Sequence, residues 1–289
     1  MKLRPKLPGG SGGSTWASLA ASTATNVGHV RSSNEDFVQA ATVVHDGRSY
    51  SVWAVADGVG GGPDGERASA TAVETVLAYL CTESWLEPAD GLTSAFKLAN
   101  QRVFDITGQG RAATTLVVAL VSEPDGEVTI ANVGDSRAYL VAGGKSRQIT
   151  QDHSLVAEKV AAGRMTADEA RTAPDRNMLT RAVGSEAEVH TDMFGPWNLR
   201  PGERVVLCTD GVHGLIDDLT IGQLGGDLPM DSASGALVDA ALRAGGHDNA
   251  TALVGGFAPR AGQAACVNDD AGRLRPAVLS RLWRHIGQI

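Results

Sequence analysis

Several aspartates stand at or beside the ends of apolar runs, where a carboxylate is well placed to bind a cation. One apolar run leads straight into Asp57-Gly58 and another into Asp210-Gly211. Asp248 comes just before the apolar run 250–257, and Asp135 lies in the same kind of setting. Carboxylates beside buried strands are costly to ionise alone, and oxygen-bound divalent cations are the usual remedy. The pattern predicts a site for hard cations, although a single Asp-Gly pair is as often a plain turn.

A second kind of chemistry is indicated by Arg31, which precedes Glu35 and Asp36 by four and five residues. The planar fork of a guanidinium can bind two phosphate oxygens at once. Taken alone, the cluster is explained more simply as a surface ion pair. Beside a cation site, it predicts a place for a phosphate group.

These residues need a framework of strands and helices. Apolar runs separated by turn signals predict strands at 37–44, 50–56, 115–121, 128–133, 136–141, 205–208 and 250–257. Asp125-Gly126 and Gly143-Gly144 predict hairpin turns. Helical spacing of apolar residues predicts helices over 66–80, through 95–106 and over 232–244. Because each helix must cover an apolar sheet face, the pattern favours a mixed α and β fold, mostly antiparallel, with helices outside the sheets.

Composition excludes several classes of protein. With a net charge of −8 and a pI near 5.4, the 289-residue chain has no basic field for nucleic acid. The cysteines, Cys81, Cys208 and Cys266, are far apart and form no CxxC pair, which argues against a disulfide framework and predicts a reducing, cytoplasmic location. Cys208 is expected to be core packing. No apolar run reaches the roughly 18 residues of a membrane span.

The chain divides by composition into three parts. Residues 1–22 are expected to be a flexible, glycine-rich leader, and residues 23–258 one compact domain. Residues 259–289 are expected to be a tail with a short basic amphipathic helix, because apolar residues recur at helical spacing over 279–286 among arginines. Within the domain, the polar, alanine-rich segment 151–190 is predicted to be an irregular helical insertion over the site.

Together the motifs resemble, in order and spacing, those of the protein phosphatase 2C family over about residues 23 to 257. The matching segments are Arg31 with Asn34-Glu35-Asp36, Asp57-Gly58-Val-Gly60-Gly61, Asn132-Val-Gly-Asp-Ser-Arg137, Asp152-His153-Ser154, Leu179-Thr-Arg-Ala-Val-Gly184, Thr209-Asp210-Gly211 and Gly246-His-Asp248-Asn249. The resemblance implies an α+β fold, an α-β-β-α sandwich of two antiparallel β-sheets flanked by helices. That architecture agrees with the pattern of predicted elements.

The resemblance also implies roles for individual residues. Asp57 would bridge two cations, with the Gly58 carbonyl on one of them. Asp210 and Asp248 would bind the other cation. Arg31 would bind the substrate phosphate. The implied cofactors are two Mn²⁺ or Mg²⁺ ions, about 3.5 to 4 Å apart, whose shared hydroxide attacks phosphorus in line.

Further implied roles concern the surroundings of the two ions. Glu35 and Asp36 would shape the water shell of the metals. Asp135 with Asp210 resembles a weak third metal position. The implied catalytic residues are therefore Arg31, Asp57 and Asp210.

The chain departs from the family pattern in two places. Ala113 replaces a usual glycine, a change that is conservative in size. Family members carry a histidine, a candidate general acid, at positions that are Val59 or Gly62 here. Without an acid, hydrolysis of phosphoserine would slow by roughly 10² to 10⁴. A metal-bound water, or His153 or His213, would have to protonate the leaving group instead.

The function expected from the resemblance is a protein serine/threonine phosphatase acting on phosphorylated proteins. The expected partners are a Ser/Thr kinase and its substrates, or a phosphorylated regulator of the anti-sigma-antagonist kind. The alternative is a pseudophosphatase that binds phosphoproteins with little activity. The presence of Asp57, Asp210 and Asp248 speaks against that alternative.

Overall fold

The computed structural model describes residues 16–108, 110–123, 125–259, 266–268 and 274–276. One compact unit comprises Leu19–Phe257, and the two ends of the chain, Met1–Ser18 and Ala258–Ile289, form a second unit. In the second unit, β12 (Cys266–Asn268) and β13 (Leu274–Pro276) pair as antiparallel strands. The basic helix expected near the end of the tail lies outside the described residues.

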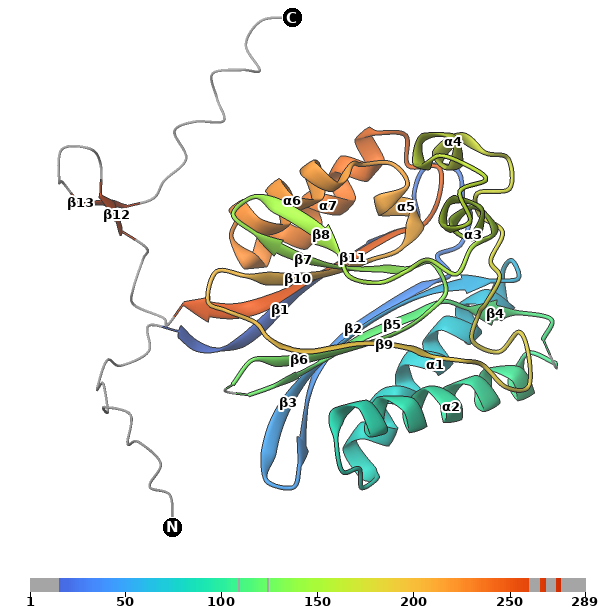
Figure 1. The fold of residues 1–289 in the computed structure, drawn as a ribbon, viewed down its shortest axis with the longest axis horizontal. Helices are drawn as coiled ribbons and strands as arrows, with labels where there is room; N and C mark the ends of the chain where they lie inside the picture. Colours follow the sequence, from blue (N-terminus) through green and yellow to red (C-terminus); the bar gives the residue numbers. More distant parts are fainter. Residues whose placement is uncertain (1–15, 109, 124, 260–265, 269–273, 277–289) are drawn as a thin grey trace, which may run out of the picture. The chain divides into compact units, whose positions relative to one another are not determined.

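The first sheet of the large unit carries a pair of long helices on its outer face (Figure 1). Its strands, in spatial order, are β2 (Asp36–His45), β3 (Arg48–Val59), β5 (Leu116–Ser122), β6 (Glu127–Val133) and β9 (Asp192–Asn198), and the short β4 (Ala113–Thr114) pairs with β3. The helices are α1 (Pro63–Thr82) and α2 (Pro88–Ile106). Each begins at a proline, whose fixed φ suits the first helical position.

The second sheet lies against the first and is covered by the C-terminal helices (Figure 1). Its strands, in spatial order, are β1 (Trp16–Asn26), β11 (Ala250–Pro259), β10 (Arg204–Cys208), β7 (Arg137–Ala142) and β8 (Lys145–Gln148). The helices here are α5 (Asp210–His213), α6 (Asp218–Asp227) and α7 (Met230–Arg243). The α-β-β-α sandwich of two antiparallel sheets expected from the sequence is thereby confirmed.

The central strands are buried on both faces because each sheet lies between two apolar layers. In β3, Val52 and Ala54 belong to the core under α1 and α2, whereas Trp53 and Val55 point into the core between the sheets. In β10, Cys208 packs in the core under the C-terminal helices, as expected for a structural cysteine, and desolvation raises the pKa of its thiol to about 12. This alternation fixes the register of the strands that end at the candidate site.

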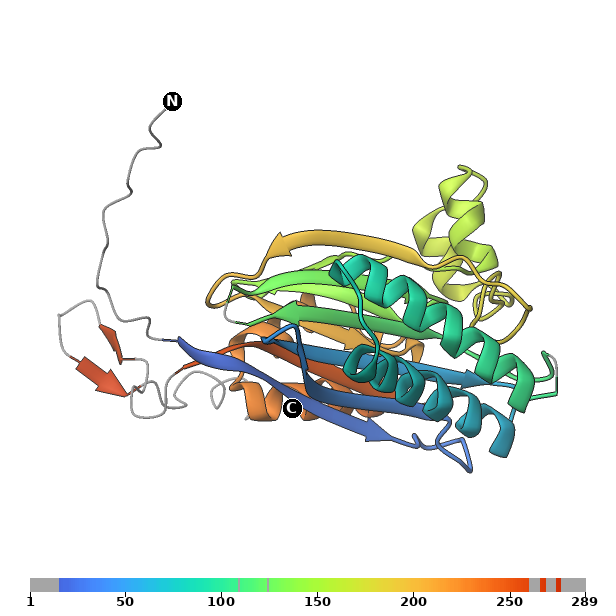
Figure 2. The same ribbon diagram turned by 90° about the horizontal axis from the view of Figure 1, so that it is seen from below.

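The insertion contains two short helices, α3 (Leu155–Ala161) and α4 (Ala167–Thr172), joined by irregular chain. Figure 2 shows them projecting beyond the layered body. The helix α4 has a capping box between Thr166 and Glu169 but no buried residue. The prediction of an irregular helical insertion is confirmed, and its helices depend on caps more than on a core.

The sequence missed six elements of the large unit, among them the very short β4 and α5. The strand β1 begins at Trp16, inside the segment 1–22 expected to be a leader, because its small Ala, Ser and Thr residues give little apolar signal. The strand β9 contains Gly195 and Pro196, which normally break strands, but it lies at a sheet edge where proline is tolerated. The edge strand β8 is short and polar, and α6 contains three glycines.

Candidate metal centre and pocket

The predicted carboxylates gather where strand ends of both sheets meet. Asp57 lies in β3 and faces Asp36, the first residue of β2, across the strand pair. Asp210 follows β10 directly, and Asp248 lies in the loop before β11. Asp36, Asp210, Asp135 and Asp248 all exert their charge on Asp57. The structure therefore brings together aspartates from five separate parts of the chain.

Crowding changes the protonation of these carboxyls. Desolvation first, and then the charges of Asp36 and Asp210, raise the pKa of Asp57 well above its usual value. Desolvation raises the pKa of Asp36 to about 7. Desolvation and the charge of Asp248 raise the pKa of Asp210 to about 6. A group of carboxylates with mutually raised pKa values lacks the positive charge that would balance it.

Two buried carboxylate oxygens of the cluster have no hydrogen-bond partner. Asp36 accepts a hydrogen bond from the Thr209 hydroxyl at 2.9 Å through Oδ2, while its Oδ1 is buried and unpartnered. Asp210 Oδ1 is likewise buried and unpartnered. Orphan carboxylate oxygens within a cluster of raised pKa fit hard divalent cations.

The donor set is an open one. Among the residues that the structure describes, no three His, Cys, Asp or Glu side chains close around a single point. Mg²⁺ commonly keeps several waters and takes only one or two protein carboxylates, and Mn²⁺ also prefers oxygen ligands. The arrangement therefore suits cations that are held largely through water.

Close backbone contacts support the glycine at the end of β3. The Gly58 amide donates to the Glu35 carbonyl at 3.1 Å, and a Cβ at Gly58 would lie 2.3 Å from the Gly65 carbonyl oxygen. The Glu35 carboxylate accepts a hydrogen bond from the Gly62 amide at 2.7 Å. One carboxylate oxygen of Glu35 therefore helps to shape the glycine loop, and only glycine fits at position 58.

Arg31 lies at the rim of the site with half of its side chain exposed. Its Nη2 donates to Asp248 Oδ2 at 2.7 Å, and this hydrogen bond raises the pKa of the guanidinium. The predicted phosphate ligand and the predicted metal ligand are thus neighbours. The exposed part of the guanidinium remains open to a substrate.

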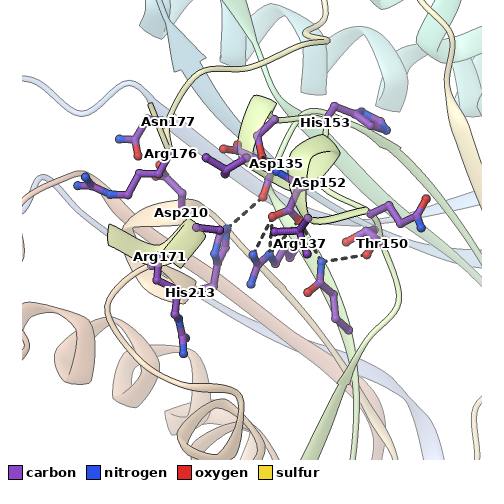
Figure 3. A pocket seen from close by; sticks show the side chains of 18 of the residues that line it. Asp135, Arg137, Thr150, Asp152, His153, Arg171, Arg176, Asn177, Asp210 and His213 are labelled. Atoms are coloured by element: carbon purple, nitrogen blue, oxygen red, sulfur yellow. Dashed lines mark hydrogen bonds and ion pairs between the residues drawn. The ribbon is translucent and has the colours of Figure 1, made fainter. Parts of the chain in front are cut away.

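Asp135 is buried beside Asp210, and desolvation followed by the Asp210 charge raises its pKa well above the usual value. Its backbone carbonyl accepts a hydrogen bond from His213 Nε2 at 3.0 Å (Figure 3). Desolvation lowers the pKa of His213 to about 3, so this ring is neutral at physiological pH. His213 therefore serves to hold the Asp135 loop.

His153 is engaged on both ring nitrogens. Its Nδ1 accepts from the Gly134 amide at 3.0 Å, and its Nε2 lies 2.9 Å from Arg181 Nη1 and 3.3 Å from Asp192 Oδ2. Desolvation lowers its pKa. Neither histidine that the sequence offered as a general acid is free to donate a proton to a leaving group.

A pocket of about 720 Å³ opens between the carboxylates and the insertion. Asp135, Asp210 and Asp248 line one part of it, and Arg171 and Arg176 of the insertion line another (Figure 3). Both arginines are exposed. The sequence did not reveal this pocket, because the insertion is polar, poorly periodic and placed only by the tertiary fold.

The base of the insertion is tied to the second sheet by a partly buried ion pair. Arg137 donates through Nε and Nη2 to the Asp152 carboxylate at 2.9 and 2.7 Å, and through Nη1 to the Tyr139 hydroxyl at 3.0 Å. Asp152 also accepts from Gln148. This network holds the first residue of β7, which lies close to Asp135 in sequence, against the start of the insertion.

Comparison with known proteins places the chain among phosphatases. The family model described as protein phosphatase 2C matches residues 27–227. Protein phosphatase PhpP of Streptococcus pneumoniae is 33% identical over 236 residues, covering 78% of this chain and 93% of the relative. Serine/threonine phosphatase stp of Listeria monocytogenes is 31% identical over 242 residues, covering 80% and 92%.

Solved structures show the same fold. The PPM Ser-Thr phosphatase MsPP from Mycobacterium smegmatis, in complex with cacodylate, is 36% identical with a TM-score of 0.72, covering 83% of this chain and 98% of that one. The catalytic domain of the serine threonine protein phosphatase PstP, in complex with two manganese ions, is 29% identical with a TM-score of 0.70 and the same coverage.

Proposed function

We propose roles in catalysis for individual residues of this chain. The chain belongs to the protein phosphatase 2C family and is a metal-dependent protein serine/threonine phosphatase. Its substrates are phosphoproteins. The alternative of a binding protein with little activity finds no support among the relatives, which are named as phosphatases. Within the described residues, no helix is both long and apolar enough to cross a membrane.

Asp57, the Gly58 carbonyl, Asp210 and Asp248 would hold two Mn²⁺ or Mg²⁺ ions. One observation supports this assignment above all. The Oδ1 atoms of Asp210 and Asp36 are both buried without a hydrogen-bond partner, and both belong to carboxyls whose pKa is raised. When bound, such ions supply an activated water near neutral pH and neutralise the charge of the phosphate. Asp36 and Glu35 would orient the water shell.

Arg31 would bind the phosphate oxygens of the substrate. Its half-exposed guanidinium lies at the rim, where a phosphorylated side chain of another protein can reach it. Asp135 with Asp210 would form a weaker third cation position, supported by their proximity in the buried cluster. Because both ring nitrogens of His153 are engaged and His213 is neutral and bonded to the Asp135 carbonyl, we assign neither as donor of the leaving-group proton.

The proposed physiological substrates are a phosphorylated Ser/Thr kinase and the proteins that this kinase phosphorylates. A half-exposed phosphate ligand at the rim of an open pocket suits a phosphorylated segment of a folded protein. The proposed location is the cytoplasm, supported by the free thiols of Cys81 and Cys208. An assay of the chain against a phosphorylated kinase and against its phosphorylated targets would test the first point.

The test of the site assignment is release of phosphate from a phosphothreonine peptide with and without millimolar Mn²⁺. Wild type, Asp57→Ala and Asp210→Ala are compared with Asp231→Ala, which changes an exposed aspartate on α7. We expect metal-dependent hydrolysis that both site variants lose and the control retains. Hydrolysis by wild type in chelator, or near-normal activity of Asp57→Ala, would refute the assignment.

A further inference from the structure

Asn249 is a buried side chain, 6% exposed, whose amide joins two distant segments of the chain. Its Nδ2 donates to the carbonyls of Val27 and Ser33, both at 2.9 Å. Its Oδ1 accepts from the Glu35 amide at 2.8 Å. All of these partners lie in the loop between β1 and β2, which carries Arg31, whereas Asn249 directly follows Asp248.

Backbone contacts draw the same two segments together. The His29 amide donates to the Gly246 carbonyl at 2.7 Å. Gly28 has a φ of +80°, and a Cβ there would lie 2.3 Å from the Asp248 carbonyl oxygen. The loop can therefore approach the chain around Asp248 only because residue 28 is glycine.

The Arg31–Asp248 ion pair sits on this junction. Asp248 Oδ1 accepts from the backbone amide of Asn249 at 2.8 Å, and Asp248 Oδ2 accepts from Arg31 Nη2 at 2.7 Å. With both oxygens engaged, the carboxylate is held in one orientation, and the guanidinium is tied to it by one hydrogen bond. Movement of the loop would displace both groups together.

We propose that Asn249 is a positioning residue that fixes Arg31 and Asp248 as one unit, so that the phosphate ligand and a metal ligand keep a constant separation. The inference rests on the roles proposed above for Arg31 and Asp248. Asn249 touches neither phosphate nor metal in this scheme and acts through its two neighbours. Partners that orient metal ligands typically contribute 10- to 100-fold to affinity or activity.

The chain supplies a matched control in Asn100, which is 2% exposed and makes the same pattern of bonds elsewhere. Its Nδ2 donates to the carbonyls of Glu186 and Ala187, and its Oδ1 accepts from the Gly184 amide. Loss of either asparagine removes three hydrogen bonds from a buried loop anchor. Only Asn249 is joined to Arg31 and Asp248.

The experiment measures the Mn²⁺ dissociation constant by calorimetry, without substrate, and KM and kcat for a phosphothreonine peptide at saturating Mn²⁺. For Asn249→Ala we expect both the Mn²⁺ dissociation constant and KM to rise about tenfold, with a smaller change in kcat. Asn100→Ala should lower Tm by about as much as Asn249→Ala does, because each loses three hydrogen bonds. It should change neither the Mn²⁺ dissociation constant nor KM by more than about twofold. Gly28→Ala, which forces the junction apart with Asn249 intact, should reproduce the two shifts and covers the case in which Asn249→Ala does not fold.

A double-mutant cycle tests whether Asn249 acts through the arginine. In an Arg31→Gln background, Asn249→Ala should raise KM by no more than about twofold while still weakening Mn²⁺ binding. The inference would be overturned if the KM of the double variant rose by the product of the two single effects. It would also be overturned if the variants at 249 and 28 bound Mn²⁺ and peptide as wild type does. Failure of the proposed metal ligands would instead appear in the wild type, as absence of Mn²⁺ binding.

Discussion

The two walls of the pocket are held in different ways. The wall of carboxylates is built from strand ends and joined loops, and its supports, such as Thr209 and Asn249, are buried. The opposite wall belongs to the insertion, where α4 has no buried residue and α3 has only Val156. A cation site needs fixed geometry, whereas a surface that meets different phosphoproteins gains from adaptability. The contrast predicts that the carboxylate wall performs the chemistry and that the insertion influences the choice of substrate.

The largest effect is expected when a carboxylate is lost from the wall of strand ends, called here the rigid wall. We expect Asp57→Asn to lower kcat/KM by about 10³ or more, because the cations that stabilise the reacting phosphate lose a ligand. In chelator, the same variant should melt at a higher temperature than wild type, because the substitution removes a carboxyl with a strongly raised pKa from a repulsive cluster. Calorimetry and peptide hydrolysis give both values, and Asp231→Asn is the control. Activity within tenfold of wild type would contradict the prediction.

The second prediction concerns pH in the metal-free protein. The folded pKa values of about 7 for Asp36 and about 6 for Asp210 exceed the ordinary aspartate value near 3.9. The folded state therefore holds protons that the unfolded chain releases, and the contribution of these groups to stability falls as pH rises from about 4 to about 7. We expect Tm in chelator to be roughly 5 to 10 °C lower at pH 8 than at pH 5.5.

The comparison that isolates this effect uses Asp210→Asn, in which the difference in Tm between the two pH values should shrink. Added Mn²⁺ should reverse the trend in wild type, because protons compete with cations for the same oxygens. A Tm in chelator that rises from pH 5.5 to pH 8 as strongly in wild type as in Asp210→Asn would show that the cluster is not strained by charge.

On the adaptable wall, effects should be smaller and depend on the substrate. Arg176→Gln should lower kcat/KM by a few-fold for peptides with an acidic residue beside the phosphothreonine, because an exposed charge pair contributes little. Hydrolysis of p-nitrophenyl phosphate should be unchanged. Arg164→Gln, on the same insertion but outside the pocket lining, is the matched control. Equal losses on both substrates would place Arg176 in the rigid wall.

The smallest effect is expected for the capping box of α4. Thr166→Ala should destabilise that helix by about 1 kcal/mol, seen as faster amide hydrogen exchange over 167–172. Mn²⁺ affinity and the melting temperature of the large unit should not change, because α4 contributes no buried residue. Thr172→Ala, at the other end of the helix, is the control. A shift in Mn²⁺ affinity would show that the two walls are energetically coupled.

Prediction from sequence succeeded where local pattern and chemistry coincide. The alternation in β3 and the apolar stripe of α1 are local, so both elements were predicted, and Asp57 and Asp210 were found because each ends such a strand. The strand β1 was missed because its small Ala, Ser and Thr residues give little apolar signal, and its neighbour in the sheet, β11, lies far along the chain. Asn249 belongs to a motif that the sequence analysis recognised, but no role could be predicted for it. Its hydrogen-bond partners are more than 200 residues away in sequence. Arg171 and Arg176 became visible only when the fold placed the insertion over the carboxylates.

The pairing of β1 with β11, reinforced by Asn249, has a consequence for the timing of activity during synthesis. During synthesis β1 and Arg31 emerge early, and their partners are among the last residues of the large unit to emerge. Until β11 has emerged, the first strand has no neighbour and Arg31 has no Asp248. A nascent chain, or one truncated before Asp248, therefore lacks both the Arg31–Asp248 pair and the sheet partner of β1, and we expect it to have no phosphatase activity.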